Sequence, residues 1–166
     1  MPELTGLLVA GRRRTDPAVT AAIAARLEAA CTEVYAGPGV EAGGASPITV
    51  QGGASSRLAV IVAALERAST PLVAVVGAEL TRADPRVLTA LAGRWRGEAA
   101  VVPVVGGRVR PLHGIYATTA ADRLREVLDE GTRSVMHALS AVGASVVGDE
   151  VWGQMDEEGS FAVPPS

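Results

Sequence analysis

The segment "TPLVAVVG" constrains the fold more than any other stretch of the chain. Residues 70–76 are apolar at almost every position, so both faces of a strand formed here would be hydrophobic. A strand with one solvated face alternates polar and apolar residues, whereas a strand covered by helices on both faces is apolar throughout. The segment is therefore expected to be a central strand of a parallel sheet that is covered on each side.

The remaining sequence alternates between strand and helix patterns, as such a sheet requires. A strand at residues 4–10 is followed by a helix that starts with Asp16 as N-cap and Pro17 at its first position. The same reading predicts further strands at residues 33–36, 48–50, 99–105, 109–116 and 145–148, and helices entered at Ser55 and Pro85 and over residues 120–130 and 133–142. Gly106 and Gly107 form a natural hairpin turn, which introduces an antiparallel strand. We expect a three-layer α/β/α, Rossmann-like fold with a mostly parallel sheet and one antiparallel strand.

Length and charge limit the classes of protein that fit. The chain has 166 residues, of which 48% are hydrophobic and 20% charged, with a net charge of −3. This length fits a single domain over residues 1–166, with a tail at 151–166 that is expected to be loosely ordered. The negative charge argues against nucleic acid as a partner, and no apolar segment is long enough to span a membrane. A cytoplasmic protein is expected, because no charged-then-apolar leader opens the chain.

The complete absence of lysine and asparagine restricts the chemistry. All 15 basic side chains are arginines. A lysine ammonium is therefore missing as a phosphate ligand, as a Schiff-base former and as a base with a lowered pKa. Arginine can still bind phosphate oxygens through two parallel hydrogen bonds.

Glycine-rich and charged segments follow several of the predicted strands. Residues 11–14 follow the first strand, Gly52 and Gly53 precede a helix, and residues 77–79 follow the central strand. In open α/β sheets, ligands bind in the crevice beyond the carboxyl ends of the strands. These segments are therefore expected at one edge of the sheet, around a ligand site.

Two long segments carry a resemblance to a known family. They are "GGASSRLAVIVAALERASTPLVAVVGAELTRADPRVLTAL" and "AVVPVVGGRVRPLHGIYATTAADRLREVLDEGTRSVMHALSAVGASVV". In order and content they resemble the molybdenum cofactor guanylyltransferases, within the sugar-nucleotide type of nucleotidyltransferases, over roughly residues 5–150. The resemblance implies the nucleotide-diphospho-sugar transferase fold. It also implies GTP and molybdopterin, or a related small molecule, as the ligands.

The resemblance also implies roles for particular residues. The first loop of the family holds the triphosphate, and its glycine-rich turn approaches the guanine base, here with Ser55 and Arg57 close by. The nucleotide-binding residues implied in this chain are Ala10, Gly11, Arg12, Arg13, Arg14, Gly52 and Gly53. Glu79 stands where the family has an aspartate that holds magnesium. Arg110 and His113 lie on the strand that borders the acceptor.

The chain departs from the family at the positions on which catalysis depends. The first loop lacks its second glycine and its lysine, and the tail "FAVPPS" has no counterpart of the family's Asn-x-Asn-Thr-Pro motif. Fewer backbone amides make a poorer anion cradle. Loss of the lysine contact is expected to cost a few kcal/mol of transition-state stabilisation, or roughly 10²–10³ in rate.

The sequence leaves several readings open. Arg12 to Arg14 also suit a solvated loop, Glu79 suits a position near a helix N-terminus, Gly52 and Gly53 suit a plain helix entry, and His113 suits a buried strand position. Three functions remain: a guanylyltransferase with eroded motifs, a non-catalytic subunit that serves a protein partner, or a guanylyltransferase of the same fold acting on a phosphorylated acid.

Overall fold

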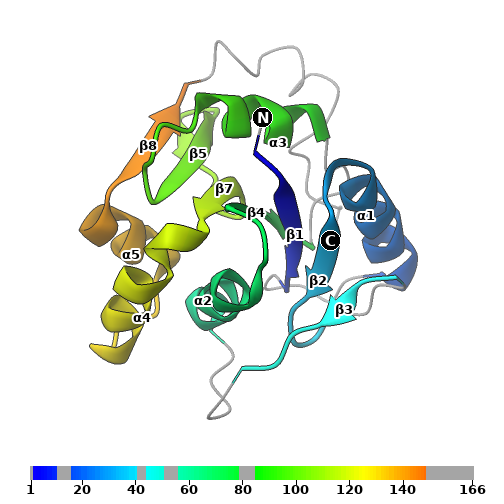
Figure 1. The fold of residues 1–166 in the computed structure, drawn as a ribbon, viewed down its shortest axis with the longest axis horizontal. Coiled ribbons are helices and arrows are strands. Elements are labelled where there is room, and N and C mark those ends of the chain that lie inside the picture. The colour runs from blue at the N-terminus through cyan, green and yellow to red at the C-terminus, as the bar shows by residue number, and fades with distance from the viewer. Residues whose placement is uncertain (1, 11–15, 41–43, 51–55, 79–84, 149–166) are drawn as a thin grey trace.

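The computed structural model describes residues 2–10, 16–40, 44–50, 56–78 and 85–148 (Figure 1). In this part of the chain, strands and helices alternate as the sequence predicts. The strands are β1 (Leu4–Val9), β2 (Glu33–Ala36), β3 (Ser46–Pro47), β4 (Leu72–Gly77), β5 (Ala100–Val105), β6 (Arg108–Val109), β7 (His113–Ala117) and β8 (Ala144–Val147). The helices are α1 (Pro17–Ala30), α2 (Arg57–Arg67), α3 (Pro85–Arg94), α4 (Ala121–Asp129) and α5 (Val135–Val142), with a 3-10 turn at Thr118–Ala120.

The strands form one mixed, mostly parallel sheet. Its order is β3-β2-β1-β4-β7-β5, and β5 also pairs with β6 and β8. The strands β1, β2, β3 and β4 are parallel neighbours, and β5 and β8 form a second parallel pair. Between these groups, β7 is antiparallel to both β4 and β5, and the two-residue strand β6 is antiparallel to β5. The expected fold class is confirmed.

Helices cover both faces of this sheet. The strand β4 shows why, because all six of its residues are buried. Val73 and Val75 pack in the cluster that contains α2, α4 and α5, whereas Leu72, Ala74 and Val76 pack with α1 and α3. Burial of each of these valine and leucine side chains contributes about 1.5–3 kcal/mol relative to exposure. Figure 1 shows the two helical layers on opposite sides of the strands.

The start of α1 follows the predicted pattern. The Asp16 side chain accepts a hydrogen bond from Ala18 N at 2.9 Å, and Pro17 occupies the first helical position. None of the helices in the described ranges is long and apolar enough to cross a membrane.

Two local predictions are wrong by one to three residues. Ser56, not Ser55, is the N-cap of α2, and its hydroxyl accepts a hydrogen bond from Ala59 N at 3.2 Å. The strand predicted at 48–50 is found at Ser46–Pro47 instead. Ile48 lies just beyond it and is 3% exposed, which explains its apolar character without a strand.

Candidate functional site

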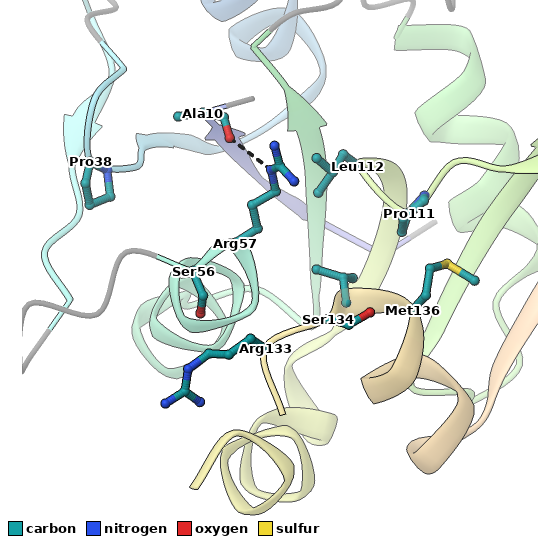
Figure 2. Close-up of a pocket in the computed structure, with 10 residues that line it drawn as sticks. Ala10, Pro38, Ser56, Arg57, Pro111, Leu112, Arg133, Ser134 and Met136 are labelled. Carbon is teal, nitrogen blue, oxygen red and sulfur yellow. Dashed lines mark hydrogen bonds between the residues drawn. The ribbon is translucent and has the colours of Figure 1, made fainter. Parts of the chain in front are cut away.

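A cleft of about 740 Å³ lies where β1 and β2 end (Figure 2). The strand order in the sheet is β3-β2-β1-β4. The chain therefore adds β2 and β3 on one side of β1 and β4 on the other, so the strand order reverses between β1 and β4. Such a reversal leaves a crevice at the carboxyl edge of the strands, which is where open α/β sheets bind ligands. The described lining residues are Ala10, Pro38, Ser56, Arg57, Pro111, Leu112, Arg133, Ser134, Val135 and Met136.

The first turn of α2 brings a cation to the end of β1. Ser56 is the N-cap of this helix, and Arg57 is its first residue. Both residues line the cleft. Arg57 Nε donates a hydrogen bond to the carbonyl oxygen of Ala10 at 3.2 Å. Figure 2 shows the side chain reaching from α2 toward Ala10. The terminal nitrogens Nη1 and Nη2 make no hydrogen bond to other described residues, which leaves the fork of donors available for an anion.

The opposite wall of the cleft is a bulge in the antiparallel part of the sheet. On β5, three steps separate Val101 from Val104, but their partners Ile115 and Val109 are six steps apart. The surplus residues, 110–112, leave the ladder and form what we call the 110–112 bulge. The strand predicted at 109–116 is therefore interrupted, and the reason is a local register difference. Bulges of this kind occur next to active sites, where they redirect side chains.

Backbone hydrogen bonds hold the 110–112 bulge at both ends. Arg110 N donates to Pro103 O at 2.8 Å, and Arg110 O accepts from His113 N at 3.2 Å. Leu112 O accepts a hydrogen bond from Gly77 N, the last residue of β4, at 2.7 Å. The bulge is thus fixed to the carboxyl end of the central strand.

A buried side chain holds the middle of the bulge. The hydroxyl of Tyr116 donates a hydrogen bond to the carbonyl oxygen of Pro111 at 2.6 Å. Tyr116 is 1% exposed. Burial raises the pKa of Tyr116 well above its ordinary value of 10.0. The phenol therefore remains a hydrogen-bond donor throughout the physiological pH range.

The start of α5 completes the cleft. Ser134 is its N-cap, with a hydrogen bond from His137 N to Ser134 Oγ at 3.3 Å. The neighbouring Arg133 directs its Nη1 to Leu128 O at 3.0 Å, at the end of α4, so its charge is partly engaged by a helix C-terminus. Met136 is 40% exposed and adds an apolar side chain to the rim.

The charge of the described lining favours an anion. It contains two arginines, Arg57 and Arg133, and no aspartate or glutamate. The N-termini of α2 and α5 meet at the same cleft, and the first amides of a helix lack intrahelical acceptors. Arginines and helix N-termini in one cleft suit phosphate groups, whose oxygens accept several hydrogen bonds at once.

The described part of the cleft offers no site for a bare magnesium ion. Among the described residues, no group of three or more His, Cys, Asp and Glu side chains could hold a metal. The predicted ligand, Glu79, lies outside the described residues. Magnesium prefers oxygen ligands and usually binds through one or two carboxylates plus substrate phosphates. With the described lining alone, the phosphates of a nucleotide would supply most of its ligands.

The residues predicted from the sequence fall into three groups. Ala10 lines the cleft, and its role in nucleotide binding stays a prediction. Arg110 lies in the bulge with its Nε buried and without a hydrogen bond to a described residue, and His113 starts β7 at 1% exposure. Neither of the two is part of the described lining, so their contact with an acceptor stays a prediction. Gly11, Arg12, Arg13, Arg14, Gly52, Gly53 and Glu79 lie outside the described residues.

The sequence-based prediction of the site misses several residues of the cleft and gives Arg57 only part of its role. The sequence places Arg57 only near a guanine base, whereas in the structure it also bonds to the end of β1. Pro38, Pro111, Ser134 and Met136 line the cleft because of the tertiary arrangement. For Ser134 there is a local signal, a serine at the start of an apolar helix pattern.

Comparisons with known proteins identify the fold. No protein-family model matches the chain, and no curated protein matches its sequence. A structure of a protein from Aquifex aeolicus superposes with a TM-score of 0.79 at 14% identity, over 99% of this chain and 94% of that one.

Two further similar structures are of proteins with a named activity. Molybdopterin-guanine dinucleotide biosynthesis protein A from Archaeoglobus fulgidus has a TM-score of 0.73 at 23% identity, over 97% of this chain and 91% of its own. The 2-C-methyl-D-erythritol 4-phosphate cytidylyltransferase from Thermus thermophilus has a TM-score of 0.62 at 22% identity, over 89% of each chain. The chain therefore has the nucleotide-diphospho-sugar transferase fold that these nucleotidyltransferases share.

Proposed function

We propose that the chain binds GTP in the cleft and belongs to the nucleotidyltransferases, with molybdopterin or a related phosphorylated small molecule as the acceptor. The observation that carries the proposal is the position of Arg57. Its Nε is held by Ala10 O at 3.2 Å, at the carboxyl edge of the sheet, in a cleft whose described lining has no carboxylate. A guanidinium fixed in this way can direct its other donors to a phosphate without losing further side-chain freedom.

The proposed ligands fit the size and the charge of the site. A cleft of about 740 Å³ lies within the range of small-molecule and cofactor sites. The choice of guanine and molybdopterin is supported by the similarity to the molybdopterin-guanine dinucleotide biosynthesis protein A of Archaeoglobus fulgidus. Similarity to a cytidylyltransferase makes CTP the nucleotide to compare with GTP.

In the proposed reaction, a phosphate oxygen of the acceptor attacks the α-phosphorus of GTP. A new P–O bond forms, and the bond to pyrophosphate breaks, so that pyrophosphate leaves with the electron pair. Catalysis of this step depends on positioning and on neutralising the charge of the phosphates. Arg57 and the N-terminus of α2 would supply positive charge. Arg12, Arg13 and Arg14 would add to it from the first loop, and Glu79 would hold magnesium.

Isothermal titration of the purified chain with GTP, with and without magnesium, tests the proposal. CTP and ATP serve as controls for the base. Micromolar, magnesium-dependent binding with a preference for guanine is expected, and a turnover assay with molybdopterin then tests the transfer step. The absence of heat with every nucleotide at millimolar concentration would end the proposal.

The titration becomes specific to this cleft with one pair of variants. Arg57→Met keeps most of the length of the side chain and removes its charge, and GTP affinity is expected to fall about 10-fold to 100-fold. Arg26→Met is the matched control, because Arg26 is exposed on the second half of α1 and is not among the described residues that line the cleft. Equal affinities for these two variants would place the nucleotide elsewhere.

A non-catalytic role is the second candidate, and the sequence favours it at one point. The chain has no lysine and no asparagine, so two of the family's polar contacts are missing. A subunit that binds the nucleotide or the dinucleotide product without turnover would show normal titration and no pyrophosphate release. A protein partner that supplies the missing groups would restore release when it is added.

A further inference from the structure

We propose that Tyr116 is a positioning residue for the cleft, because its hydroxyl fixes the 110–112 bulge that forms the wall opposite α2. The inference rests on the proposed function for its ligand, but its structural part concerns one hydrogen bond. Tyr116 OH donates to Pro111 O at 2.6 Å, across five residues of the same antiparallel segment. A regular strand cannot make this contact, because residues five apart in a strand lie about 16 Å apart. The 110–112 bulge brings Pro111 and Tyr116 closer together than a regular strand would.

The donor is rigid because the ring of Tyr116 is built into the core. Tyr116 is 1% exposed and belongs to the hydrophobic cluster with residues of α2, α4 and α5. Its strand, β7, is held on both sides, since Tyr116 pairs with Val73 of β4 and with Ala100 of β5. The hydroxyl therefore has a fixed position relative to the centre of the sheet.

The acceptor needs this donor more than an ordinary residue would. Pro111 has no backbone N–H, so it cannot add a ladder hydrogen bond of its own. Backbone bonds hold the bulge at Arg110 and at Leu112, on either side. Among the described residues, Tyr116 provides the hydrogen bond that reaches the residue between them.

The position of the bulge matters to a ligand because two of its residues face the cleft. Pro111 and Leu112 line it together with Arg57 and Met136 (Figure 2). A wall that is already in place lowers the entropic cost of ordering the site when a ligand binds. Tyr116 would act on the ligand through this wall and would not touch it, because it is not among the described lining residues.

Hydrogen exchange tests the structural part without any ligand. The Gly77 amide donates to Leu112 O and the Arg110 amide donates to Pro103 O, so both amides report the bulge directly. In Tyr116→Phe, exchange of these two amides is expected to become about 3-fold to 10-fold faster. Tyr35→Phe is the matched control, since Tyr35 is the other tyrosine of the chain and its hydroxyl bonds to Glu33.

Three results would overturn the proposal. The first is exchange of Gly77 and Arg110 at the wild-type rate in Tyr116→Phe. The second is an equal acceleration of amides in the centre of β4, such as Val73, which would indicate general destabilisation. The third comes from Pro111→Ala, which keeps the accepting carbonyl and is expected to leave Gly77 near its wild-type rate. If exchange of the Gly77 amide were accelerated as much in Pro111→Ala as in Tyr116→Phe, the proline ring and not the Tyr116 hydroxyl would keep the bulge rigid.

A GTP titration of the same variants tests the effect on the ligand. The dissociation constant is expected to rise about 3-fold to 10-fold in Tyr116→Phe and to stay unchanged in Tyr35→Phe. Faster exchange of Gly77 with unchanged affinity would overturn the role in ligand binding. If the wild-type chain binds no nucleotide, the proposed function fails, whereas the exchange rates still decide whether Tyr116 fixes the bulge.

Discussion

Arg57 Nε donates a hydrogen bond to the carbonyl oxygen of Ala10, 47 residues earlier in the chain, at 3.2 Å. This contact joins the first turn of α2 to the end of β1, across the edge of the sheet where the winding reverses. A side chain with several donors can make such a contact and keep further donors for a ligand. A lysine ammonium has three donors on one nitrogen, so it lacks the planar fork with which an arginine can bond a carbonyl and still face two phosphate oxygens.

The absence of lysine from the chain provides a direct test of this arrangement. Arg57→Lys introduces the one side-chain amine of the protein, and an amine-reactive ester will acylate it. If the cleft binds GTP, the nucleotide at ten times its dissociation constant is expected to slow the acylation roughly tenfold. Peptide mass spectrometry separates this site from the chain's α-amine. Arg26→Lys, on the exposed face of α1, should be acylated at the same rate with and without GTP. Equal protection of the lysines in the two variants would contradict the prediction.

The serine cap of α2 predicts that stability and ligand affinity can be separated. Ser56→Ala removes the acceptor for Ala59 N and is expected to lower the free energy of unfolding by about 1 kcal/mol. Ser56→Asp keeps a capping acceptor, so the free energy of unfolding should stay close to wild type. The new carboxylate would lie in the cleft, however, and GTP affinity should fall at least about fivefold.

Chemical denaturation and titration measure the two effects. Ser140→Ala, on the exposed face of α5, is the control and should change the free energy of unfolding by less than about 0.5 kcal/mol. A Ser56→Asp variant that binds GTP as tightly as the wild type would show that the phosphates lie away from this helix start.

The fold could be predicted from the sequence because its signals are local. Asp16 and Pro17 start α1 where the cap pattern predicts, and the apolar run at 70–76 contains most of the buried strand Leu72–Gly77. Each of these signals lies within a few residues of the structure it specifies, and the α/β alternation then leaves few arrangements of the sheet.

The cleft could be predicted only in part, because its parts meet through long-range contacts. The pattern at 109–116 reads as one strand, and only its register against β5 reveals the three surplus residues of the bulge. The contact of Arg57 with Ala10 depends on how β1 and α2 pack, which no local pattern encodes. The roles predicted for Gly11, Arg12 and Glu79 remain predictions, since these residues lie outside the described part of the chain.

Replacement by alanine is expected to have opposite effects at two glycines, because the space around them differs. At Gly114, a Cβ would lie 2.8 Å from Val102 Cγ1 and 3.1 Å from Val101 O, so Gly114→Ala is expected to cost about 1–3 kcal/mol of the free energy of unfolding. Gly93, in α3, has no atom within 4 Å of such a Cβ, and Gly93→Ala should stabilise the chain by about 0.5–1 kcal/mol. Thermal unfolding of both variants measures the difference, and a Gly114→Ala variant as stable as the wild type would contradict this packing of β7.

A carboxylate at the opposite edge of the sheet predicts how stability depends on pH. Glu33 accepts hydrogen bonds from Thr5 Oγ1, Tyr35 OH, Ser69 N and Ser69 Oγ at 3.1–3.3 Å. Burial acts to raise the pKa of Glu33, but these hydrogen bonds outweigh it, and the pKa lies below its ordinary value of 4.5. The folded chain therefore binds the proton of Glu33 less readily than the unfolded chain does.

The stabilisation by the charged form of Glu33 is thus present above pH 4.5 and is lost as the pH falls through the lower pKa of the folded state. Glu33→Gln should be less stable than the wild type at pH 7, by at most about 1 kcal/mol because water screens this partly exposed group. The difference should shrink as the pH falls below 4.5. Urea unfolding of both proteins between pH 7 and pH 3 measures it, with Glu3→Gln as an exposed control. A difference that stays constant over this range would show that the hydrogen bonds do not depend on the charge of Glu33.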